Sequence, residues 1–98
     1  YIENLPSDAC VEVPCYIDST GVHPVKVGKL PAHLAAMNAS NIGVQLMTIE
    51  AALTKDRRRI YQAAMLDQHT AAELNIHDII QMCDELIEAH GEYMKDYR

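Results

Sequence analysis

The chain has 98 residues, the size of one small domain, and this length leaves no room for a second one. Eight Lys and Arg against fourteen Asp and Glu give a net charge of −6, which opposes binding to nucleic acid or to anionic membrane surfaces. With 49% hydrophobic and 22% charged residues the chain is globular rather than disordered, and because Phe and Trp are absent its core must use aliphatic side chains and Met.

The first residue and the cysteines indicate whether the chain is a fragment and in which cellular compartment it occurs. Tyr1 stands where an initiator Met or a signal sequence would be expected, so we interpret the chain as a fragment. Cys10, Cys15 and Cys83 are odd in number and lack CxxC spacing, which favours a reducing cytoplasm. We expect all three to be buried, unreactive thiols.

Residues 9–28 are predicted to form a β-hairpin. Polar and apolar residues alternate over residues 9–18 and again over 22–27, and the turn residues Ser19, Thr20 and Gly21 lie between. The first strand should be half-buried, with Val13, Cys15 and Ile17 on one face.

The remaining chain is predicted to be helical, so the fold class is α+β: a mainly helical segment with an N-terminal hairpin. Asp56 is a candidate N-cap, and Thr70 to Glu73 has the form of a capping box. The first helix is apolar nearly all round and should be buried on more than one side. The helices are expected at about residues 31–54, 57–66, 70–74 and 76–94.

Several polar groups could carry chemistry, but each has a simpler structural explanation. His69 and Glu73 lie four residues apart without the second His of a zinc motif. An anion-binding role for Asp56 to Arg59 is less favoured than a solvated helix face. Acid and base roles are less favoured than a solvated helix face for the carboxylates Asp84, Glu85 and Glu88. Metal-ligand roles are less favoured than surface or capping roles for the remaining histidines considered, which are His33, His77 and His90. We therefore predict no catalytic, cofactor-binding or metal-binding residue.

Segments along the whole chain resemble the sequence motifs of one enzyme family. Residues 4–15 read NLPSDACVEVPC, 21–31 read GVHPVKVGKLP, and 49–57 read IEAALTKDR. The further segments are LAAMN at 34–38, YQAAMLD at 61–67 and DELIEAHG at 84–91. In this order they resemble the NAD- and manganese-dependent glycosidases of glycoside hydrolase family 4. Within the family, the α-galactosidases, which act on melibiose-type sugars, are the most similar in three segments: HLAAM, YQAAML and HTAAEL.

This resemblance implies a C-terminal part of a lactate-dehydrogenase-like substrate domain, with the Rossmann domain absent. In such enzymes NAD oxidises the sugar at C3, a base removes the C2 proton, the glycosidic bond is eliminated and water adds, in place of a carboxylate pair. NAD and Mn²⁺ would be bound in the full-length enzyme and neither by this segment. The implied partners are the N-terminal NAD-binding domain, an α-galactoside and further copies in a cytoplasmic homo-oligomer. The segment would be structural and inactive alone.

Two other interpretations stay open. The chain could be a stand-alone helical interaction or oligomerisation module that presents the apolar face of residues 76–87 to a partner helix. Alternatively, the enzyme class could be right and the substrate an α-galacturonide or a 6-phospho-α-glucoside.

Overall fold

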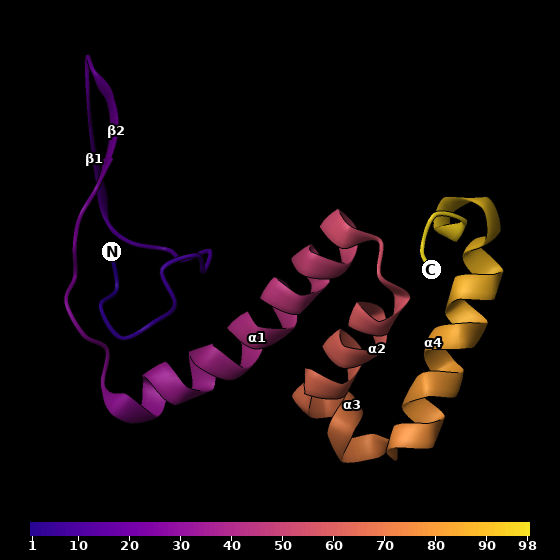
Figure 1. The fold of residues 1–98 in the computed structure, drawn as a ribbon. Helices are drawn as coiled ribbons and strands as arrows, with labels where there is room; N and C mark the ends of the chain where they lie inside the picture. The colour runs from indigo at the N-terminus through magenta and orange to yellow at the C-terminus, as the bar shows by residue number, and fades with distance from the viewer. The chain divides into compact units, whose positions relative to one another are not determined.

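The computed structural model describes all residues from Tyr1 to Arg98, in two compact units of residues 1–42 and 43–98. We call them the N-terminal and the C-terminal unit. A two-stranded hairpin is followed by four α-helices and a 3-10 turn, which confirms the predicted α+β class (Figure 1). The elements are β1 (Cys15–Asp18), β2 (Gly21–Pro24), α1 (Ala32–Thr54), α2 (Arg57–Leu66), α3 (Gln68–Glu73), α4 (Ile76–His90) and the turn Gly91–Met94.

The hairpin is shorter and more exposed than predicted. Antiparallel pairing runs only from Cys15 opposite Pro24 to Asp18 opposite Gly21, because Pro14 and Pro24 lack the N–H that would extend the ladder. Gly21 has a φ of +129°, which suits glycine in the turn. Every residue of β1 is exposed, so the predicted half-buried strand is wrong: the sheet has two strands, and no second layer covers its apolar face.

The first residues are held against the segment that follows β2. Ile2 forms a parallel bridge with Gly28, and the Val27 N–H donates to the Tyr1 carbonyl at 3.0 Å. The side chain of Asn4 then pairs with the backbone of Leu30 twice, donating to its carbonyl and accepting from its N–H, both at 2.9 Å. These contacts fix the path of the N-terminal unit up to the start of α1.

Helix α1 follows Pro31 and ends where Lys55 takes a left-handed φ of 57°. Ala35, Ile42 and Ala51 of this helix are buried, and at about 100° per residue Ala51 lies on the opposite side of the axis from Ile42. The helix is therefore buried on more than one side, as predicted, although only at these three positions. The exposed apolar side chains include Leu34, Met37, Ile49 and Leu53.

The longest helix is α1, with 23 residues, and neither it nor any other helix is both long and apolar enough to cross a bilayer.

Side-chain caps define where α2 and α3 begin. Asp56 accepts a hydrogen bond from the Arg58 N–H at 3.0 Å, which confirms its predicted role as the N-cap of α2. Asp67 caps α3 by accepting from the N–H and the hydroxyl of Thr70, both at 2.8 Å. The predicted capping box at Thr70 is therefore wrong, because the cap lies three residues earlier and α3 begins at Gln68.

Asn75 is the N-cap of α4, and its side chain accepts from the Asp78 N–H at 3.0 Å. Asn75→Ala is expected to lower the free energy of unfolding by about 1 kcal/mol, because this donor loses its partner. Asn75→Asp retains the acceptor and is the matched control, expected to unfold within a few tenths of a kcal/mol of the parent. Urea titration followed by circular dichroism measures both; equal losses in the two variants would show that the cap does not stabilise α4.

The core of the C-terminal unit lies where α2 packs against α4, which Figure 1 shows side by side. Its buried residues there are small or aliphatic: Ala63 from α2, and Ile79 and Cys83 from α4. The α-helical part of α4 ends at His90 rather than at residue 94, because Gly91 has a φ of +52° and the chain tightens into the 3-10 turn.

Candidate functional site

The best-formed polar cluster of the C-terminal unit joins α2 to α4. The Arg57 guanidinium donates to the Tyr61 hydroxyl through Nε and to Asp84 Oδ1 through Nη2, both at 2.7 Å. The Tyr61 hydroxyl donates to the same Asp84 oxygen at 2.5 Å. Arg57 and Tyr61 are four residues apart on one face of α2. Asp84, which contacts both of them from α4, lies 27 positions from Arg57 and 23 from Tyr61 in the sequence.

These contacts set the protonation of the cluster. Hydrogen bonds from Tyr61 and Arg57 lower the pKa of Asp84, so this carboxylate is ionised at neutral pH. Burial, and then the hydrogen bond to Asp84, raise the pKa of Tyr61. An ionised acid whose oxygen is already bound by two donors is unsuited to general acid catalysis, so the cluster is a structural link.

The predicted acid and base candidates of α4 separate in space. Asp84, expected on the solvated side of the helix, instead faces α2. Glu85 accepts from Gln81 on its own helix at 2.9 Å, and Glu88 is exposed. The Asp84 contacts could not be predicted, because a pairing between residues so far apart in the sequence depends on how two helices pack.

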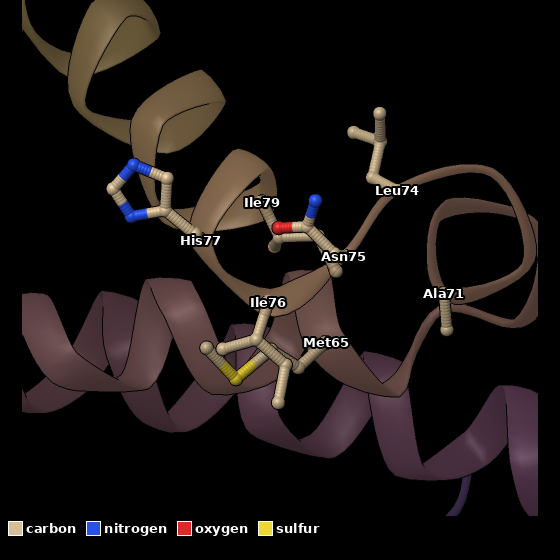
Figure 2. A pocket seen from close by; sticks show the side chains of 7 residues that line it. All are labelled: Met65, Ala71, Leu74, Asn75, Ile76, His77 and Ile79. Carbon is tan, nitrogen blue, oxygen red and sulfur yellow. The ribbon is translucent and has the colours of Figure 1, made fainter.

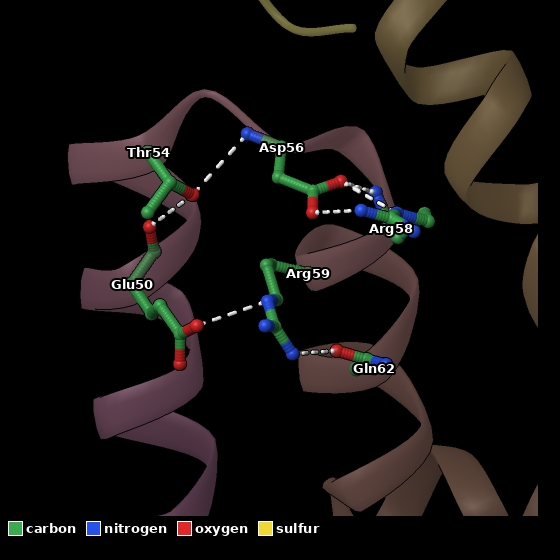
Figure 3. A network of polar contacts seen from close by, with 6 residues as sticks. All are labelled: Glu50, Thr54, Asp56, Arg58, Arg59 and Gln62. Atoms are coloured by element: carbon green, nitrogen blue, oxygen red, sulfur yellow. Dashed lines mark hydrogen bonds and ion pairs between the residues drawn. The ribbon is translucent and has the colours of Figure 1, made fainter.

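The run from Asp56 to Arg59 does not form an anion cradle, because each arginine is paired with an acid. Figure 3 shows two of these pairs, those of Arg58 and Arg59. Arg58 binds its neighbour Asp56 at 2.9 Å, and Arg59 binds Glu50 of α1 at 3.0 Å. The prediction that this face is solvated holds for Arg58, whose side chain is 83% exposed. It is wrong for Arg57 and Arg59, which link α2 to α4 and to α1.

The end of the chain is docked on the junction between α1 and α2. The Arg98 N–H donates to the Lys55 carbonyl at 3.0 Å, and the Arg57 N–H donates to the Arg98 carbonyl at 2.8 Å. The Lys55 ammonium lies 4.6 Å from the centre of the Tyr97 ring, a cation–π contact. Arg57 is thus held by its backbone to the tail and by its side chain to Tyr61 and Asp84.

Two substitutions of Lys55 separate backbone strain from the contact with Tyr97. Both variants lose the cation–π contact, but only glycine adopts the left-handed backbone without strain. We expect Lys55→Ala to be about 1 kcal/mol less stable than Lys55→Gly. Chemical denaturation of both variants tests this, and equal stabilities would show that the junction relaxes to another backbone conformation.

A second polar cluster lies on the hairpin. Asp18 accepts from the Thr20 hydroxyl at 2.6 Å and lies 3.0 Å from His23 Nε2, while the His23 ring stacks on Tyr16 at 4.6 Å. The hydrogen bonds from Thr20 are the main reason why the pKa of Asp18 is lowered. Thr20 and Asp18 both contact the same ring nitrogen, whereas a catalytic relay uses the two nitrogens separately. This cluster stabilises the turn.

The other histidines and the cysteines do not come together. His33, His69, His77 and His90 are all exposed, and no group of three or more His, Cys, Asp or Glu could hold a metal ion. Cys83 is buried as predicted, and this burial raises the pKa of its thiol. Cys10 and Cys15 are exposed, so the prediction of buried thiols is wrong for them: Cys15 lies in the exposed strand β1, and Cys10 precedes that strand.

Two open grooves of the C-terminal unit lie along α4. The larger, of about 610 Å³, lies where α2, α3 and α4 meet and is mostly apolar, with Asn75 and His77 on its rim (Figure 2). The smaller, of about 200 Å³, is lined by residues of α2, α4 and the 3-10 turn. Neither groove gathers convergent polar or titratable groups, so neither has the composition of an active site.

Comparison with known proteins assigns the chain to a family. Residues 1–70 match the model described as the family 4 glycosyl hydrolase C-terminal domain. The chain belongs to this family. It is 55% identical to an alpha-galactosidase of Bacillus subtilis, over 99% of this chain and 22% of that protein. This confirms the resemblance seen in the sequence.

More distant relatives of the chain differ in the activities that their names state. It is 33% identical to an alpha-galactosidase of Rhizobium meliloti, over 98% of this chain and 20% of that protein. It is also 33% identical to a maltose-6'-phosphate glucosidase of Fusobacterium mortiferum, over 94% of this chain and 20% of that protein. The chain spans about a fifth of the length of these relatives. No solved structure matches it.

Proposed function

We propose that these residues are the C-terminal part of an α-galactosidase that releases galactose by oxidation, elimination and addition with NAD and Mn²⁺. The observation that carries the proposal is 55% identity to an alpha-galactosidase over 99% of the chain. The family's chemistry explains why no carboxylate pair is needed for the reaction.

Within such an enzyme, this segment has a structural role. Its polar clusters tie α1 to α2 and α2 to α4, and the chain's own residues supply no set of metal ligands. We assign the binding of NAD and Mn²⁺ to the remainder of the longer protein. The same proposal includes a cytoplasmic homo-oligomer, in which this segment contributes to packing rather than to the reaction.

A second substrate class is favoured by one specific observation. Relatives of 33% and 28% identity are named for glucosides that carry a phosphate group. A 6-phospho-α-glucoside is therefore the alternative substrate. The α-galactoside is preferred because its named relative is the more similar by far.

The experiment assays the full-length protein that carries this segment. We expect it to hydrolyse p-nitrophenyl α-galactoside only when NAD and Mn²⁺ are both present, and to be inactive on p-nitrophenyl 6-phospho-α-glucoside. Addition of a chelator, or omission of NAD, should abolish activity. Hydrolysis of the galactoside with chelator and without NAD would contradict the mechanism, and selective hydrolysis of the phosphorylated glucoside would replace the substrate assignment.

A further inference from the structure

The part of α1 that belongs to the C-terminal unit has one covered and one open side. Ala51 is 4% exposed, and its neighbour Glu50 binds Arg59 of α2 at 3.0 Å. Ile49 and Leu53 are 52% and 80% exposed. At about 100° per residue, both lie about 160° around the helix axis from Ala51, on the side away from it.

The open side forms a continuous uncharged stripe. Its members are spaced three and four residues apart and are all exposed: Gln45, Thr48, Ile49, Ala52 and Leu53. A helix face that remains in water usually carries charged residues, as the exposed face of α4 does with Glu85 and Glu88. Ile49 and Leu53 without any charge between them are typical of a face that packs against protein.

We propose that this stripe of α1 is covered by the part of the same polypeptide that lies outside the 98 residues, an inference that rests on the proposed membership of a longer enzyme. The relatives are about five times longer than this chain, so most of their polypeptide is available to cover it. A segment of the same chain is already tethered, so it pays little of the translational entropy that a separate partner loses on binding.

The size of the stripe favours this occupant over a second copy. The nine residues from Gln45 to Leu53 span roughly 14 Å, and one face of a helix is roughly 10 Å wide, so the stripe offers roughly 140 Å². A stable association of separate chains buries about 800 Å² on each partner. The stripe alone is too small for a stable dimer, whereas a contact of this size is ordinary between helices of one chain.

The test is photo-cross-linking in the full-length protein. The photoreactive residue p-benzoylphenylalanine replaces Leu53 in one variant and Ile49 in a second, so that a folding failure at one site leaves the other. A third variant with the probe at Tyr93, which is 88% exposed and outside the stripe, controls for unspecific reaction. Irradiated protein is separated by mass, and the linked peptides are identified by mass spectrometry.

We expect the stripe positions to cross-link within one polypeptide, to peptides that precede Tyr1. Cross-links between two polypeptides would overturn the proposal in favour of a second copy. No cross-link, or the same peptides and yields from Tyr93, would overturn it in favour of an open face. The reaction needs no substrate, so its outcome is independent of the activity assay that tests the proposed function.

Discussion

Replacing Ile79 by alanine is expected to lower the free energy of unfolding by about 3 kcal/mol, the largest effect of any substitution considered. Ile79 is 2% exposed and lies in the contact between α2 and α4. The smaller side chain removes apolar burial and leaves a cavity that rigid helices fill only in part. Loss of helical circular dichroism with urea measures the effect.

The matched control is Ile76→Ala in the same helix. Ile76 is 65% exposed, so its truncation should change the free energy of unfolding by less than about 1 kcal/mol. Equal losses at the two positions would contradict the packing of α4 on α2, since the two variants differ mainly in burial. A larger loss at Ile76 in the full-length protein would instead place a partner segment on the larger groove, which Ile76 lines.

Replacing Tyr61 by phenylalanine is expected to destabilise the protein by about 1 kcal/mol. The ring remains, but Asp84 loses its hydroxyl donor at 2.5 Å and Arg57 loses an acceptor at 2.7 Å. Hydrogen bonds to charged groups contribute more than this when fully buried, and the partial exposure of the cluster reduces the value. Tyr93→Phe, at a side chain that is 88% exposed, is the control and should be neutral.

The same variant changes the response to acid. Because the folded-state pKa of Asp84 lies below its unfolded value of about 3.9, folding releases its proton, and the stabilisation is complete above that pH. It is lost as the pH falls through the lowered pKa. Tyr61→Phe returns the pKa of Asp84 toward its ordinary value, so the melting temperature should fall less steeply with acid. A parallel fall in both proteins would mean that Tyr61 does not lower this pKa.

Local features of the fold could be predicted from the sequence. The start of α2 follows from its predicted cap Asp56, because a cap acts within two or three residues of itself. The apolar face predicted along residues 76–87 is buried at Ile79 and Cys83, whereas its members Ile76 and Leu86 are exposed. The misplaced start of α3 arose because Thr70 and Asp67 are both good caps, and only the path of the chain decides between them.

Burial and long-range pairing could not be predicted, because both depend on neighbours far along the chain. The alternation around Cys15 and Ile17 correctly indicated a strand, but whether anything covers that strand depends on residues elsewhere. In the same way, the sequence suggests that Arg57 is solvated, and only the packing of α4 against α2 places Asp84 beside it. The family resemblance rested on sequence motifs along the whole chain. The functional assignment depended on this resemblance, because no cluster of residues in the chain indicates catalysis.

The most direct test of the account is complementation. The 98-residue chain and the remainder of the longer protein are expressed separately, and each is assayed alone and after mixing, with p-nitrophenyl α-galactoside, NAD and Mn²⁺. We expect hydrolysis only in the mixture, because this segment completes the enzyme without supplying catalytic groups. Hydrolysis by the 98-residue chain alone, or equal activity of the remainder without it, would contradict the account.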